Sequence, residues 1–171
     1  MSRLLWFVLG FVVAIAALLV GGYLFLTAGG VSMETTASPL PLERTVARIA
    51  LHASYGSAAQ QKDPLPRDDA NMVAGAKIYK TRCAVCHGLP GQPSSDIARG
   101  MFPNPPQLFH QDEMVTDDPE GITFWKVTHG IRLSGMSGFE RTLSDTARWQ
   151  VTMLVAHADA LSPAVRAVLT R

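Results

Sequence analysis

Two cysteines and a histidine lie within five positions of one another and have the clearest chemical use in the chain. Cys83 and Cys86 are its only cysteines, and His87 directly follows the second. Two thiols at this spacing lie on one helical turn, where they can form thioethers with the two vinyl-derived carbons on one edge of a porphyrin. The adjacent imidazole then reaches the iron from one face. The pattern therefore predicts one covalently attached haem c, with His87 as an axial ligand.

Other uses of a Cys-x-x-Cys pair fit the sequence less well. A structural zinc site needs four ligands, typically with a second Cys or His pair at short spacing, and the sequence has none. A thioredoxin-like redox pair needs a βαβ context, which this helical pattern lacks. A disulfide would suit an exported protein, but it would leave His87 without a role.

The second axial ligand decides what a haem does, and several side chains are candidates for it. The candidates are Met33, Met72, Met101, Met114, Met136 and Met153, with His52, His110, His129 and His157. Met136 lies in the glycine-flanked segment 134–138, which can bring a thioether against a planar ring. Met101 and Met114 are the main alternatives, and His129 is the leading histidine.

The elements that must position these residues follow from hydrophobic periodicity and capping residues. We expect four helices, beginning near Asp69, at Pro119, after Ser144 and at Pro163. Asp68 or Asp69 is the expected cap of the first, Asp118 of the second and Ser144 of the third. The segment from Gly88 to Pro119 is rich in proline, glycine and aspartate, and its three prolines within 103–106 forbid a regular helix or a central strand there. A loop of this length inside a compact domain needs something to hold it, and a haem supplies that core. The predicted fold is small and all-α, with long loops around the haem.

Further features occur along the same stretch in a recognisable order. They are Gly75 and Tyr79, the motif Cys83–Gly88, the stretch Phe124–Gly130, the pair Gly135–Met136, and Trp149. Together they resemble a class I cytochrome c domain over about residues 69–160. The resemblance implies that Met136 is the distal ligand, with Ser137 where family members often have proline. It also implies that a proline carbonyl accepts the imidazole N–H, and we expect Pro103 or Pro105.

The N-terminal segment Leu4–Leu26 predicts a transmembrane helix. It holds 23 residues, of which only three glycines fall outside the apolar set. At about 1.5 Å per residue it extends roughly 34 Å, enough for a hydrocarbon core of about 30 Å. A cleaved signal peptide has a shorter apolar region and a small-residue cleavage site, which Thr27–Gly30 matches only in part. Arg3 precedes the segment and Glu34 is the first charge after it, so the remainder is expected outside the cytoplasm.

These observations divide the chain into three parts. They are an anchor over 1–27, a stalk over 28–68 and a cytochrome c domain over 69–171. Within the stalk, apolar residues at helical spacing predict a short amphipathic helix over about 41–54. Its apolar face packs on its own domain, on a partner or on the membrane surface. Residues 55–67 are expected to form an irregular loop or linker.

Composition narrows the function further. The 171 residues carry 15 basic and 14 acidic side chains, so the basic stripe of a nucleic-acid binder is absent. Arg99 and Arg132 belong to the two loops expected around the haem, residues 88–119 and 131–138. They either pair with the haem propionates or are ordinary surface residues.

The sequence thus predicts a monohaem c-type cytochrome that transfers electrons, as a carrier or as a subunit of a respiratory chain complex, with no catalytic residues of its own. It is expected as a single-pass protein of a bacterial inner membrane, with its C-terminal domain in the periplasm. The expected partners are the membrane, a quinol-oxidising complex or dehydrogenase, and a terminal oxidase or reductase. The alternative is a haem-based sensor or small-ligand binder, in which Met136 is displaced from the iron.

Overall fold

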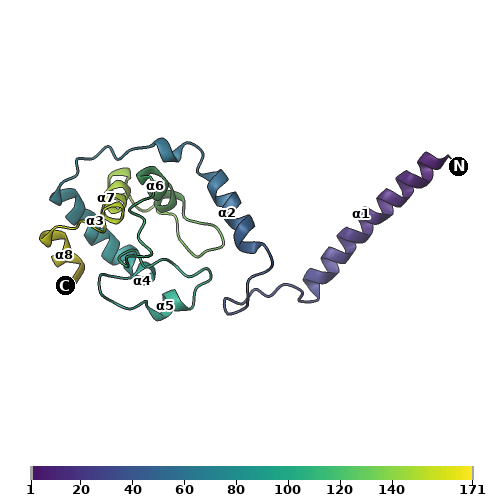
Figure 1. The fold of residues 1–171 in the computed structure, drawn as a ribbon, viewed down its shortest axis with the longest axis horizontal. Helices are drawn as coiled ribbons and strands as arrows, with labels where there is room; N and C mark the ends of the chain where they lie inside the picture. Colours follow the sequence, from purple (N-terminus) through teal and green to yellow (C-terminus); the bar gives the residue numbers. More distant parts are fainter. Residues whose placement is uncertain (1, 171) are drawn as a thin grey trace. The chain divides into compact units, whose positions relative to one another are not determined.

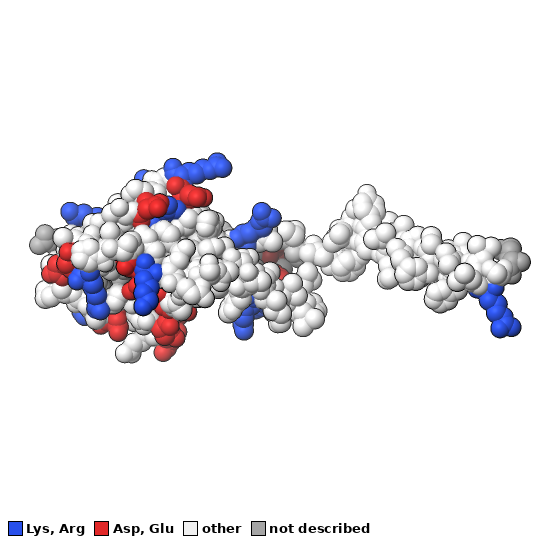
Figure 2. All heavy atoms as spheres, turned by 90° about the horizontal axis from the view of Figure 1, so that it is seen from above, with Lys and Arg blue, Asp and Glu red and all other residues white. Residues whose placement is uncertain are grey.

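The computed structural model describes residues 2–170, and the chain divides into two units (Figure 1). The first unit ends at Pro41 and contains the helix α1, Arg3–Thr27. Beyond Arg3 this helix carries no charged side chain, and Figure 2 shows it as an uncharged rod. α1 is long and apolar enough to cross a membrane, a property that an N-terminal signal sequence shares.

The second unit begins at Leu42 and consists of short helices joined by irregular chain. Its elements are α2 (Glu43–Ser54), η1 (Ala58–Gln60), α3 (Asp69–Arg82), α4 (Ala84–His87), α5 (Asp96–Arg99), α6 (Glu120–His129), α7 (Asp145–Ala156) and α8 (Pro163–Thr170). Residues 2–170 contain no strand, and the nearest feature is an isolated bridge between Ile131 and Met136. The predicted all-α fold with one N-terminal apolar helix is therefore confirmed.

Two helices begin at the capping residues that the sequence indicated. At α3, the Asp68 carboxylate accepts the backbone N–H of Asn71 at 2.8 Å. At α7, the Ser144 hydroxyl accepts the backbone N–H of Ala147 at 3.2 Å. Each cap satisfies a backbone donor that the first helical turn leaves without an internal partner.

The start of α6 differs from the prediction. Pro119 has a non-helical ψ of 130°, so the helix begins one residue later, at Glu120, and Asp118 is too far back to cap it. The Asp118 carboxylate instead pairs with the Lys126 ammonium at 2.9 Å. The predicted end is confirmed, since α6 stops at Gly130 with a φ of 69°.

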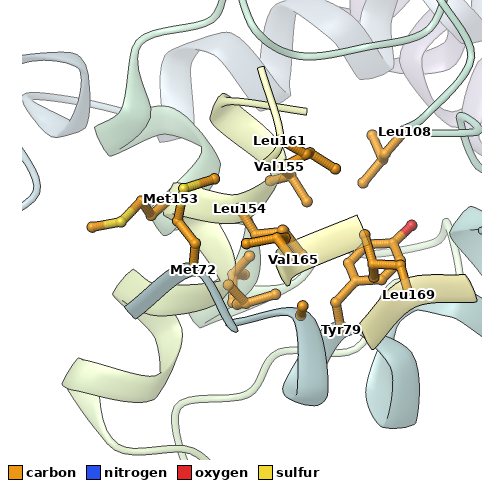
Figure 3. Close-up of a cluster of buried hydrophobic side chains, with 12 residues drawn as sticks. Met72, Tyr79, Leu108, Met153, Leu154, Val155, Leu161, Val165 and Leu169 are labelled. Atoms are coloured by element: carbon orange, nitrogen blue, oxygen red, sulfur yellow. The ribbon is translucent and has the colours of Figure 1, made fainter. Parts of the chain in front are cut away.

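The hydrophobic core lies where α3 packs against α7 and α8 (Figure 3). Its buried members are Met72, Ala76, Tyr79, Leu108, Val127, Val151, Met153, Leu154, Val155, Leu161, Val165 and Leu169. α3 and α7 are in close backbone contact at Gly75, where an added Cβ would lie 2.7 Å from the backbone carbonyl carbon of Gln150. Met72 and Met153 are thus packing residues of the core rather than free to reach a haem iron.

The segment between α2 and α3 packs on α6. Ala58 of η1 is buried against Gly121, where an added Cβ would overlap the Ala58 carbonyl oxygen. The ring of Tyr55, just after α2, meets Trp125 edge-on at a centroid distance of 5.3 Å. The chain over 55–67 is mostly irregular, as expected, but these contacts fix it in place. The start of the haem domain at residue 69 stays a prediction.

Candidate haem site

One cavity of about 530 Å³ is lined by all four candidate ligand and attachment residues. Cys83, Cys86 and His87 line it from the junction of α3 and α4, and Met136 lines it from the loop after α6. The remaining wall is mainly apolar and includes Tyr79, Leu108, Val127, Phe139, Val151 and Val155. The volume lies in the range of about 300–1,000 Å³ that is usual for cofactor pockets.

A single helical turn presents the cysteines and the histidine together. Cys83 is the C-cap of α3 and the N-cap of α4, so it is the single residue between the two helices. The His87 backbone N–H donates to the Cys83 carbonyl at 2.9 Å, which closes the turn. Gly88 then leaves the turn with a φ of 73°, a conformation that favours glycine.

The His87 imidazole is held in one tautomer. Its Nδ1 lies 2.8 Å from the carbonyl oxygen of Pro106, which can only accept, so Nδ1 carries the proton. Nε2 therefore keeps the lone pair that a metal ion needs. Burial lowers the pKa of His87, while the bond to Pro106 raises it less, so the ring is neutral at pH 7. The expected acceptor, Pro103 or Pro105, was wrong, because the loop register places Pro106 at this position.

Two hydrogen bonds set the register of this proline-rich loop. The Leu108 backbone N–H donates to the His87 carbonyl at 3.2 Å. The side-chain amide of Gln107, which is buried, donates to the Cys86 carbonyl at 3.0 Å. Both bonds join the loop to the cysteine–histidine turn, and Pro106 directly precedes the residues that make them.

Tyr79 supports the same turn from the core. The side chain is fully buried, and its hydroxyl lies 3.0 Å from the His87 carbonyl and 2.9 Å from the Gly88 carbonyl. Burial is the main cause that raises the pKa of this phenol, so it stays protonated and can donate. Its ring contacts Phe109 edge-on at 5.1 Å, which joins the core to the loop.

The chemistry of the cysteines favours a thioether over a thiolate. Burial first, and the charge of Cys86 second, raise the pKa of Cys83 to about 12. Reactive free thiols have a lowered pKa, so Cys83 does not suit the role of a nucleophile. Over residues 2–170, no three His, Cys, Asp or Glu side chains gather where they could hold a free metal ion. A thioether has no proton to lose, and the site therefore fits a covalently attached haem.

The loop after α6 holds the backbone of Met136 in place. The Ile131 backbone N–H donates to the Met136 carbonyl at 3.1 Å. At its base, a Cβ added to Gly130 would lie 2.6 Å from the backbone nitrogen of Gly138, so the two ends of the loop are in close contact. This closure limits where the thioether can go.

The cavity shortens the list of distal candidates. Met101 and His52 line it together with Met136, whereas Met114 and His129 do not. His129 is 46% exposed and lies near a surface glutamate, which fits a surface role. Met136 as the distal ligand stays a prediction.

Sequence reasoning missed the basic residues of the cavity wall. These are Arg48, Arg82 and Lys126. The expected propionate partners, Arg99 and Arg132, do not line the cavity, and Arg99 pairs with Asp96 instead. The amphipathic spacing over 41–54 contained a signal for Arg48, but it could not show which face of the helix meets the domain.

An all-α fold with a Cys-x-x-Cys-His turn and a methionine loop around one apolar cavity is that of a c-type cytochrome domain, a haem-binding module for electron transfer. Residues 70–153 match the family described as cytochrome C oxidase, cbb3-type, subunit III, which confirms the resemblance seen in the sequence.

Other comparisons are more distant. A chain of the Kuenenia stuttgartiensis reducing HAO-like protein complex is 22% identical, with a TM-score of 0.48 over 75% of this chain and 68% of that chain. A search of curated proteins returned no significant match.

Proposed function

We propose that this protein is a membrane-anchored electron carrier with one haem c, attached through Cys83 and Cys86 and ligated by His87 and Met136. The observation that carries the proposal is the shared cavity, which all four side chains line. The tautomer of His87, set by the carbonyl of Pro106 at 2.8 Å, supports its role as a ligand.

The protein groups explain why such a site suits electron transfer. With His87 and Met136 as its two ligands, a bound haem would supply one-electron transfer without an open coordination position. Hydrogen bonds from Tyr79 and from the proline-rich loop hold His87 in place, and the closed loop after α6 holds Met136. Little rearrangement therefore accompanies the electron transfer. The apolar wall and the neutral thioether favour the less charged, reduced iron and so raise the potential.

The proposed location is the periplasmic face of a bacterial inner membrane. α1 supports a single-pass anchor, because it has the length and composition of a membrane span. Arg3, the first residue of α1, supports a cytoplasmic N-terminus. Covalent attachment of haem also requires export to a compartment where the cytochrome matures.

The proposed partners are redox proteins on either side of the carrier. A quinol-oxidising complex or dehydrogenase would supply electrons, and a terminal oxidase or reductase would receive them. The matched family is named for a subunit of a cytochrome c oxidase, which supports an oxidase as the acceptor. The protein then works as a diffusing carrier or as a fixed subunit of such a complex.

The test is the visible spectrum of the detergent-extracted full chain, oxidised and reduced, with and without carbon monoxide. We expect haem that stays bound after denaturation, a low-spin spectrum, a methionine–iron(III) charge-transfer band and indifference to carbon monoxide. Met136→Ala should abolish that band, lower the potential and admit carbon monoxide. Met101→Ala is the matched control, since this methionine lines the same cavity and should leave the band unchanged.

Other outcomes would redirect the assignment. Carbon monoxide binding by the unchanged protein would contradict the carrier and favour the sensor or ligand binder. A band lost in Met101→Ala and kept in Met136→Ala would make Met101 the distal ligand.

A further inference from the structure

The helix α2 is oriented with its polar face toward the haem cavity and its apolar face outward. Four of its residues or immediate neighbours line the cavity: Arg48, Leu51, His52 and Tyr55. On the other side, Leu42, Val46 and Ile49 are 72%, 61% and 66% exposed. A helix packed on an ordinary core turns its apolar face inward. The inner face of α2 instead carries Arg48 and His52 beside Leu51, so it brings a guanidinium and an imidazole to the cavity wall.

Contacts on α6 fix this orientation. The ring of Tyr55 packs on Trp125, and the Lys126 ammonium lies 5.8 Å from the centre of the Tyr55 ring. The burial of Ala58 against Gly121 holds the chain directly after α2. The polar face of α2 therefore cannot turn away from the cavity without breaking these contacts.

The charged side chains of the mainly apolar cavity wall are all basic. The lining includes Arg48, Arg82 and Lys126, and no aspartate or glutamate. Lys126 already has a partner, because its ammonium pairs with Asp118 at 2.9 Å. Within residues 2–170, neither Arg48 nor Arg82 forms an ion pair with a carboxylate of the chain. Two arginines at a cavity without acids call for an anionic occupant.

We infer that α2, which lies outside the matched residues 70–153, completes the haem pocket, and that Arg48 and Arg82 bind the haem propionates. This inference rests on the proposed function, since it takes haem c as the occupant of the cavity. Haem c carries two propionate carboxylates, and the two arginines supply the two unpaired guanidinium groups of the wall. A guanidinium matches the geometry of a carboxylate and stays charged at all physiological pH values.

The inference has a measurable consequence for the reduction potential. A propionate near the iron stabilises the more positive, oxidised state by Coulomb attraction. A guanidinium that pairs with the propionate offsets this attraction and raises the potential. Removal of the Arg48 charge should therefore lower the midpoint potential of the haem.

The experiment is a spectroscopic redox titration of the full chain in detergent, comparing Arg48→Gln with the unchanged protein. We expect the midpoint potential of the haem to be lower in Arg48→Gln and in Arg82→Gln than in the unchanged protein. The decrease should be larger when both arginines are replaced. Arg48→Lys keeps the charge and should retain most of the original midpoint.

Arg44→Gln is the matched control on the same helix. It removes the same charge, but the Arg44 guanidinium lies over the Phe102 ring at 5.9 Å and does not line the cavity. Its midpoint should be unchanged. An Arg48→Gln protein with an unchanged midpoint, or equal shifts in Arg44→Gln and Arg48→Gln, would overturn the inference.

The spectrum separates this failure from failure of the proposed function. A protein without covalent low-spin haem would overturn both proposals. A low-spin, covalently bound haem whose midpoint ignores Arg48 would overturn only the role of α2.

Discussion

Gly75→Ala should destabilise the second unit, although the substitution improves the intrinsic helix propensity of α3. The added Cβ would overlap the backbone carbonyl oxygen of Gln150 in α7 and lie 2.7 Å from its carbon. Backbone atoms of a packed helix cannot rotate out of the way as the end of a flexible side chain can. The two helices would have to separate, and Tyr79, one turn further along α3, would move with them.

The expected size follows from two opposing terms. Overpacking at a close contact costs about 3 kcal/mol when neither backbone can give way. The gain in helix propensity from glycine to alanine returns about 1 kcal/mol. The net loss is about 2 kcal/mol, which lowers the thermal midpoint by roughly 6–10 °C for a unit of this size.

Thermal unfolding of the haem-loaded protein, followed by circular dichroism, measures this loss. Lys77→Ala is the control, because Lys77 is exposed on the same helix and alanine there changes propensity without a clash. If the Gly75→Ala protein melts at or above the melting temperature of the unchanged protein, the close approach of α3 and α7 is refuted.

Two further predictions concern groups near the site and near α6. Tyr79→Phe removes the donor to the His87 and Gly88 carbonyls and should cost about 1–2 kcal/mol in urea unfolding, with haem still attached; an unchanged midpoint would contradict its support of the turn. Burial raises the pKa of Asp63, so its charge opposes folding above that pKa and stability is regained as the pH falls through it. Asp63→Asn should therefore raise the melting temperature at neutral pH, with no gain well below the ordinary pKa of 3.8, and a gain that persists in acid would contradict this assignment.

Features encoded in adjacent residues could be predicted from the sequence. The helix starts at Asp68 and Ser144 were foreseen because a capping side chain bonds to a backbone N–H only three residues further on. The Cys-x-x-Cys-His turn was foreseen for the same reason, since its three side chains share one helical turn. Asp118 was misjudged because its choice between capping and pairing depends on Lys126, eight residues away.

Features that depend on how distant segments meet could not be predicted. Hydrogen bonds from Gln107 and Leu108 determine which proline lies next to the His87 ring. The register of this loop cannot be read from the sequence. The basic wall of the cavity joins Arg48 and Arg82 from helices far apart in the chain. Periodicity showed that α2 has two faces, but only the packing of Tyr55 on Trp125 shows which face turns inward.

The loop that carries Met136 has a base that is held by hydrogen bonds and a tip that is exposed to solvent. Its base is held by main-chain bonds, in which Phe139 and Glu140 donate to the carbonyls of Val127 and Thr128 at 3.0 and 3.1 Å. Its tip, at Leu133, is 89% exposed. Mutations at the tip can therefore alter the surface offered to another protein while the thioether stays in place. A cytochrome with such a loop could therefore meet different redox partners through its tip while the position of Met136 stays the same.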